Sequence, residues 1–213
     1  MLSLRNGAFE YGHQRLSFPD VSIQPGERVG LYGPSGCGKS TLAQVLAGLL
    51  AQSQGVLSQP LKRKGAGSPV QWISQSPEFA FNPRWRLSRS LAESYSVSES
   101  VLARYRVKPQ WLERLPKQLS GGELQRLNIV RALAPSTEFL ICDEITAQLD
   151  AITQQEIWQV LLQDLKTRNM GALVISHSYP LLKNVCDRVI EWPEDIDLDA
   201  HLKAHPKAHP KAG

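Results

Sequence analysis

The sequence predicts an α/β fold: a mostly parallel sheet flanked by helices, with an N-terminal antiparallel edge and a small inserted helical subdomain. Short apolar segments alternate with longer amphipathic ones along most of the chain, which is typical of parallel strands joined by helices. A glycine-rich turn follows one of the first apolar segments and leads into a helical pattern. Between residues 76 and 116, four prolines divide the chain into short helical pieces, which predict the insertion.

Each element is predicted from its own pattern of apolar residues. The expected strands are 2–11 and 15–23, which alternate like an antiparallel pair with Gly12 at the turn, and then 27–32, 70–74, 139–142, 172–176 and 188–192. The expected helices are 39–50, 123–133, 152–168 and a short one from residue 180. The segment 52–68 contains several glycines and serines and is predicted to be a loop.

The composition indicates an ordinary folded protein. Of the 213 residues, 42% are hydrophobic, and no apolar run approaches the ~18 residues that a membrane-spanning helix needs. We expect one domain over residues 1–199, with the helical subdomain at about 76–134, and a disordered tail at 200–213. The three cysteines are widely spaced, which favours reduced thiols in the cytosol. The net charge of +4 is modest and scattered, so we expect no direct contact with nucleic acid.

The glycine-rich turn matches the G-x-x-x-x-G-K-[ST] pattern of a phosphate-binding loop. Its residues are Gly33, Pro34, Ser35, Gly36, Cys37, Gly38, Lys39, Ser40 and Thr41. Glycines allow successive backbone N–H groups to surround a phosphate, and the helix that follows directs its positive end at the same anion. Lys39 is expected at the β- and γ-phosphates of ATP, Ser40 at Mg²⁺, and Thr41 near the α-phosphate. This context predicts a P-loop NTPase sheet.

A second motif lies at the end of the strand that follows the insertion, where two carboxylates, Asp143 and Glu144, are adjacent. Side chains at the carboxyl end of this strand meet the phosphate loop if the sheet is parallel. We expect Asp143 to bind the Mg²⁺ shell and Glu144 to polarise an attacking water molecule, because phosphoryl transfer to water requires both functions.

A third motif, Leu-Ser-Gly-Gly-Glu-Leu-Gln-Arg at residues 119–126, opens a helix. Ser120 and the backbone N–H groups of Gly121 and Gly122 make a second candidate anion site at the start of this helix. The stretch resembles the LSGGQ signature of ATP-binding cassette (ABC) ATPases, with Glu123 in place of the usual glutamine. In that family the signature caps the γ-phosphate held by the opposite protomer.

The resemblance covers nearly the whole chain. It implies that Tyr11 stacks on adenine, that Gln75 is the glutamine near the metal and the reacting phosphate, and that His177 is the switch histidine after the last core strand. Each of these residues has an ordinary alternative: Tyr11 shares a strand face with Phe9 and would then belong to the core, while Gln75 and His177 would be polar residues at strand ends.

Two stretches are similar to the ATP-binding subunits of peptide and nickel importers: residues 75–84 resemble QDPxxSLNP, and residues 149–157 resemble LDVxxQxxI. This resemblance implies a cytoplasmic motor, peripheral on the inner face of the membrane, whose segment from Gln75 to Trp85 receives transmembrane permease subunits. It also implies a homodimer, or a heterodimer with a second ABC ATPase. Residues 145–150 read ITAQLD instead of PTSALD, which favours a non-identical partner.

Two alternatives remain open for the function. One is a soluble ABC ATPase of a non-transport complex, of nucleic-acid or phosphonate-metabolism type, and the other is a P-loop kinase with a chance signature. No motif indicates which solute would be transported. In the tail, His201, His205 and His209 recur every four residues and offer a metal site, but intervening prolines prevent the helix that would align them, so a solvated tail is expected.

Overall fold

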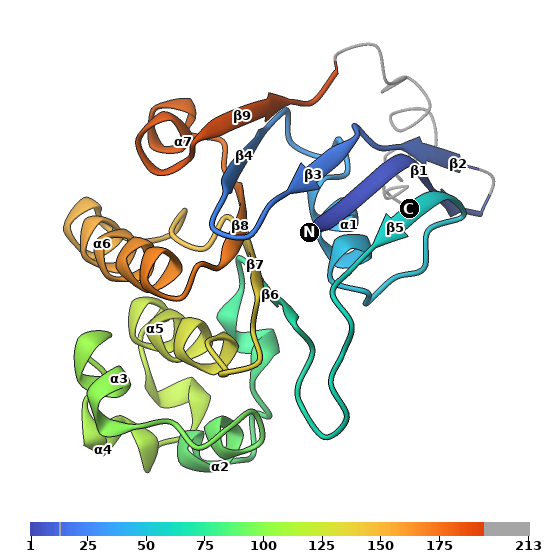
Figure 1. Ribbon diagram of the computed structural model, residues 1–213. Helices are drawn as coiled ribbons and strands as arrows, with labels where there is room; N and C mark the ends of the chain where they lie inside the picture. The colour runs from blue at the N-terminus through green and yellow to red at the C-terminus, as the bar shows by residue number, and fades with distance from the viewer. Residues whose placement is uncertain (13, 194–213) are drawn as a thin grey trace, which may run out of the picture.

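The computed structural model describes residues 1–12 and 14–193, which fold into two sheets and the helices around them (Figure 1). The larger sheet is fully parallel, in the order β6-β7-β8-β4-β9. Its strands are β4 (Arg28–Tyr32), β6 (Val70–Ile73), β7 (Phe139–Asp143), β8 (Gly171–Ile175) and β9 (Arg188–Glu191). Every residue of β7 and β8 is buried, as expected for central strands whose two faces are both covered.

The N-terminal antiparallel strands form a sheet of their own. Its members are β1 (Leu2–Tyr11), β2 (Gln14–Ser17), β3 (Val21–Ile23) and β5 (Gln54–Ser58). The strand predicted at 15–23 is interrupted at residues 18–20, where Pro19 has no backbone N–H, and its two parts, β2 and β3, pair with β1 in one register. The loop predicted at 52–68 is wrong, since it contains β5. That strand pairs with β1 and buries little, so its sequence carries a weak signal.

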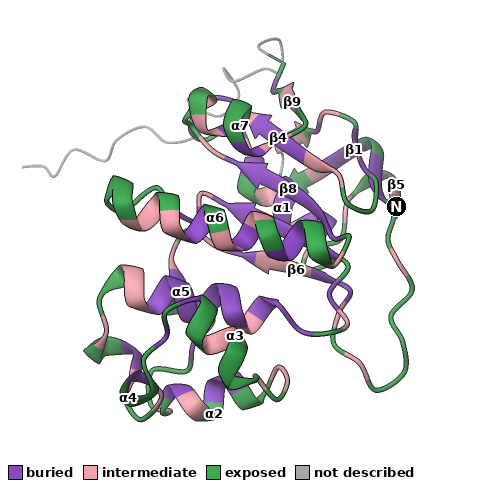
Figure 2. Cartoon of the chain, turned by 60° about the vertical axis from the view of Figure 1, so that its left-hand side comes forward, coloured by how far each residue is buried: buried purple, intermediate pink, exposed green. Residues whose placement is uncertain are grey.

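Two hydrophobic clusters cover the two faces of the parallel sheet. Alternate residues of β7 belong to different clusters: Leu140 and Cys142 face α5 (Gly121–Ala132) and α6 (Ala151–Thr167), while Phe139 and Ile141 face α1 (Lys39–Leu46). Figure 2 shows the buried strands enclosed between these layers and the exposed outer side of α6. A last helix, α7 (Tyr179–Val185), packs beside β9.

The first helix is shorter than its predicted range of 39–50. Gly48 has φ of 73°, a left-handed conformation that glycine adopts at low cost, and its N–H donates to the carbonyl oxygen of Val45 at 2.9 Å. This C-terminal cap stops α1 at Leu46, although the apolar pattern continues beyond it.

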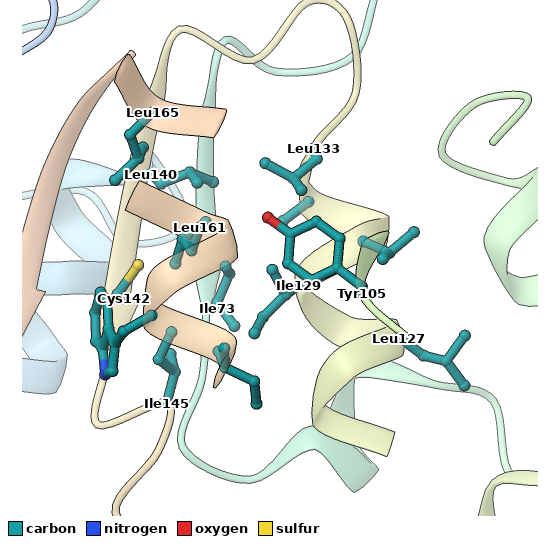
Figure 3. Close-up of a cluster of buried hydrophobic side chains, with 14 of the residues drawn as sticks. Ile73, Tyr105, Leu127, Ile129, Leu133, Leu140, Cys142, Ile145, Leu161 and Leu165 are labelled. Carbon is teal, nitrogen blue, oxygen red and sulfur yellow. The ribbon is translucent and has the colours of Figure 1, made fainter. Parts of the chain in front are cut away.

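The proline-rich insertion consists of short helices, as predicted. They are η1 (Pro77–Ala80), α2 (Leu87–Ala92), α3 (Glu99–Arg104), α4 (Pro109–Leu112) and η2 (Pro116–Gln118), and α2 to α4 lie beyond α5 in Figure 1. Tyr105, which follows α3, is fully buried, and Figure 3 shows its ring beside Leu133. Its hydroxyl donates to Asp164 of α6 at 2.9 Å, and Arg104 forms an ion pair with the same carboxylate at 2.9 Å.

None of the helices in the part of the chain that the structure describes combines the length and the apolar character that crossing a bilayer requires. The domain limits 1–199 and 76–134 stay predictions. The tail predicted to be disordered, 200–213, lies outside the described residues, as do His201, His205 and His209.

Candidate functional site

The glycine-rich turn connects the end of β4 to the first residue of α1, as its sequence predicts. Lys39 is 6% exposed, and its ammonium donates to the carbonyl oxygens of Gly33 at 2.9 Å and Pro34 at 2.7 Å. At Gly38 φ is 109°, and a Cβ atom would lie 2.4 Å from a methyl group of Leu16. The loop therefore needs glycine at this position, and it holds a fixed positive charge at the N-terminal end of a helix.

Asp143 ends β7 and lies close to the first turn of α1. It is 4% exposed; burial raises the pKa of this carboxyl, whereas the Ser40 hydroxyl beside it favours the charged form. A carboxylate next to a hydroxyl is a pair of hard oxygen donors, which suits Mg²⁺ bound jointly by protein and phosphate oxygens. The donor set therefore fits the metal that the sequence predicts at Ser40 and Asp143.

Three residues that the sequence predicts to be catalytic meet at one carboxylate. Glu144 receives a hydrogen bond from Gln75 Nε2 at Oε2 over 3.1 Å, and its Oε1 lies 2.6 Å from Nε2 of His177. Glu144 has φ of 51°, an uncommon conformation for a residue other than glycine, and its backbone N–H donates to Ile175 at 3.0 Å. His177 also lies 3.4 Å from Oγ of Ser35, which links the group to the phosphate loop.

The sheet topology explains this convergence. Gln75 follows β6, Glu144 follows β7, His177 follows β8, and the phosphate loop follows β4, which are four neighbouring strands in that order. Because the strands are parallel, their carboxyl ends share one edge, where ligands of such sheets bind. The structure thus brings together Gln75, Glu144, His177 and Ser35, although they are far apart in sequence. No pattern in the sequence indicates that His177 contacts Ser35 or that it contacts Glu144.

The signature stretch lies at the start of α5. Ser120 Oγ accepts a hydrogen bond from the backbone N–H of Glu123 at 3.3 Å, and the Glu123 carboxylate accepts one from the N–H of Ser120 at 2.9 Å. A Cβ atom on Gly122 would lie 3.4 Å from Leu149, just before α6. The helix starts at Gly121, two residues before its predicted start, because this capping box satisfies its first N–H groups.

Tyr11 ends β1 and is 79% exposed, whereas Phe9 packs against the core. The alternative that Tyr11 belongs to the core is therefore wrong, and its exposed ring is available for stacking. The role of Tyr11 at adenine stays a prediction.

Cys37 takes part in the loop through its backbone, while its thiol is turned into the core and is 3% exposed. Burial raises the pKa of this thiol, and the Lys39 ammonium, 4.0 Å away, opposes the rise.

We expect iodoacetamide to modify Cys37 at pH 7 at least about tenfold more slowly than in the unfolded chain, because the thiolate is the reactive form. Mass spectrometry of the peptide after timed labelling, with a guanidinium-unfolded control, measures this. Equal rates in the two samples would contradict the buried orientation.

Comparison with known proteins identifies the family of this chain. The ABC transporter family model matches residues 16–147. The chain is 33% identical over 214 residues to the nickel import system ATP-binding protein NikE of Staphylococcus aureus strain RF122, covering 93% of this chain and 89% of that protein, and 32% identical to its counterpart in strain MSSA476.

Solved structures show the same fold. The dimeric structure of MJ0796, a bacterial ABC transporter cassette, superimposes with a TM-score of 0.74 at 23% identity and covers 90% of this chain and 94% of that chain. A dimeric post-hydrolysis state of the same cassette, bound to ADP and Pi, gives the same values. The predicted α/β fold class is confirmed, and the chain belongs to the ABC transporter family, as an ABC ATPase.

Proposed function

We propose that this chain is the ATP-hydrolysing motor subunit of a membrane importer of the nickel or peptide type. The observation that carries the proposal is its 33% identity to a nickel import ATP-binding protein over 93% of its length. The importer-like stretches at 75–84 and 149–157 support the same type.

In this proposal the phosphate loop, residues 33–41, binds the triphosphate, and Tyr11 stacks on the adenine. The Lys39 ammonium turns from the loop carbonyls to the β- and γ-phosphates, where a charge-assisted contact is stronger than a neutral one. Ser40 and Asp143 hold Mg²⁺, with Gln75 beside it. The metal supplies positive charge that stabilises the negative charge developing on the phosphate oxygens.

Glu144 is the general base of the proposed hydrolysis. It accepts the proton of the water that attacks the γ-phosphorus, and ADP leaves. Gln75 and His177, which contact its two oxygens, hold the carboxylate at the edge of the sheet. The contact between His177 and Ser35 connects this carboxylate to the loop that binds the phosphate. Holding the base in one orientation reduces the entropy lost on reaching the transition state.

A complete site requires two chains. Ser120, Gly121 and Gly122 start α5, which is separated from the phosphate loop in sequence and belongs to the proposed helical subdomain. A second protomer, arranged head to tail, supplies its own signature to the γ-phosphate, so that ATP forms part of the interface. The partner is a second copy or a related ABC ATPase, and transmembrane permease subunits bind the pair at the cytoplasmic face of the membrane.

Glu123 should weaken the proposed ATP-bound dimer, because its carboxylate lies against the positive end of α5, where the partner's phosphate binds. Glu123→Gln keeps an oxygen that accepts from the Ser120 N–H but removes the charge. We expect the ATP concentration for half-maximal dimer formation to fall by about two- to fivefold. Light scattering with a hydrolysis-deficient chain measures it. An unchanged or higher concentration would contradict the charge argument.

Purification from native membranes tests the transport function. A tagged chain, extracted in mild detergent, should copurify with polytopic membrane proteins in stoichiometric amounts, as identified by mass spectrometry. Deletion of its gene should reduce uptake of radioactive nickel or of a labelled oligopeptide, and wild-type chain but not Glu144→Gln should restore it. Copurification with soluble enzymes or nucleic acid alone, together with unchanged uptake, would favour the non-transport alternative.

A further inference from the structure

Trp72 lies beside the carboxylate that we assign to the metal. It pairs with Ile141 across the parallel ladder of β6 and β7, and Asp143 is two residues further along β7. Side chains two residues apart in a strand share a face of the sheet. Trp72, Ile141 and Asp143 therefore lie on the face that carries α1, and the Trp72 ring packs against the α1 cluster.

The indole nitrogen of Trp72 is buried, and within the described residues it has no hydrogen-bond partner. A buried donor without a partner is rare and costs free energy, so its position calls for an explanation. The Asp143 carboxylate lies on the same face of the sheet, two residues beyond Ile141 on β7, so it is a neighbouring acceptor for this N–H.

The proposed function explains why the Trp72 indole N–H lies near Asp143. Carboxylates that bind a metal usually accept a hydrogen bond from a second residue, which selects the oxygen that faces the metal. In the described part of the chain, the Ser40 hydroxyl and the Trp72 indole N–H are the two side-chain hydrogen-bond donors placed beside the Asp143 carboxylate. Ser40 is itself assigned to the metal, so Trp72 remains as the outer donor.

We propose that Trp72 is a positioning residue of the metal site: its indole N–H donates to Asp143 when this carboxylate binds the metal, and so directs the other oxygen toward the metal and Ser40. The proposal rests on the proposed metal and nucleotide site. It assigns Trp72 no contact with the substrate.

The test separates metal-dependent from metal-free nucleotide binding. The affinity for a fluorescent ATP analogue is measured in EDTA and in Mg²⁺, and the ratio of the two dissociation constants gives the effect of the metal. Trp72→Phe keeps an aromatic ring and removes the N–H. We expect it to reduce this ratio by about tenfold, in the range of other outer-shell changes, with the affinity in EDTA unchanged. Asp143→Asn should also reduce the ratio, and Trp111→Phe, which removes a buried indole in the helical insertion, should not.

A second measurement does not depend on the stability of the variant. The five tryptophans give indole N–H resonances in the ¹⁵N-labelled wild-type chain. The resonance of Trp72 is the one that disappears in Trp72→Phe. If that variant does not fold, the Trp72 resonance is identified by assigning those of the other four tryptophans. Addition of Mg²⁺ to the nucleotide complex should shift the Trp72 resonance downfield and leave that of Trp111 in place.

The outcomes distinguish the two proposals. A wild-type chain that binds nucleotide with a metal-dependent ratio, together with an unchanged ratio in Trp72→Phe or a stationary Trp72 resonance, would overturn the role of Trp72 alone. Equal weakening in EDTA and in Mg²⁺ would show that the ring only packs. A wild-type chain without nucleotide binding, or without any effect of Mg²⁺, would overturn the site itself and the role of Trp72 with it.

Discussion

Replacing Glu144 with glutamine should reduce ATP turnover by about 100-fold or more, because the amide cannot accept the proton of the attacking water. The amide keeps the shape of the side chain and one oxygen that accepts from Gln75. ATP should therefore still bind, and the closed state should accumulate because hydrolysis no longer resolves it. We expect Mg-ATP to shift this variant from monomer to dimer, or to a tight pair with a partner ATPase, in light scattering behind a sizing column.

Ser120→Arg in the same chain should reverse this shift, because it places bulk and charge where the partner's γ-phosphate binds. The change also removes the cap of α5, which is worth about 1 kcal/mol. Ser120→Ala is the matched control, since it removes the cap without adding bulk, and it should leave most of the dimer in place. Near-normal hydrolysis by Glu144→Gln would overturn the assignment of the base. A monomer under all conditions, also with the partner ATPase, would overturn the shared site.

The meeting of the candidate site residues at one edge of the sheet was predictable because it follows from topology. A strand that ends in a glycine-rich turn and another that ends in Asp143 and Glu144 have their carboxyl ends at the same edge if both are parallel members of one sheet. The position of a residue directly after a strand is thus enough to place Gln75 and His177 near them. What the sequence does not contain is the contact itself. No local pattern indicates the 2.6 Å distance between His177 Nε2 and Glu144 Oε1 or the left-handed backbone of Glu144.

Other features escaped prediction for a common reason: their partners are distant in sequence. Strand β5 is exposed at alternate positions and is recognised as a strand only through its pairing with β1. Trp72 reads as an apolar strand residue, and its relation to Asp143 appears only when β6 lies beside β7. The helical insertion was predicted from its prolines, but the residues that attach it to α6 were not.

That attachment gives Asp164→Ala a large expected cost in stability. Asp164 is 3% exposed, and it accepts a hydrogen bond from Tyr105, whose side chain is fully buried. Removal of the carboxylate leaves the Tyr105 hydroxyl without its partner in an apolar cluster and Arg104 without its counter-ion. We expect the free energy of unfolding to fall by about 3 kcal/mol, mostly because a buried hydroxyl loses its partner; the ion pair adds less, since the Arg104 side chain is half exposed.

Chemical unfolding curves of four variants locate this cost. Tyr105→Phe should cost less, about 1.5 kcal/mol, because Asp164 keeps its ion pair with Arg104. The double variant should be less destabilised than the sum of the single ones, since the phenylalanine leaves no unpaired hydroxyl. Gln163→Ala, an exposed neighbour on α6, should change the free energy by less than about 0.5 kcal/mol. Additive effects of the two single changes would contradict a direct bond between Tyr105 and Asp164. If Asp164→Ala lowered the free energy of unfolding by less than about 1 kcal/mol, packing alone would attach the insertion to α6.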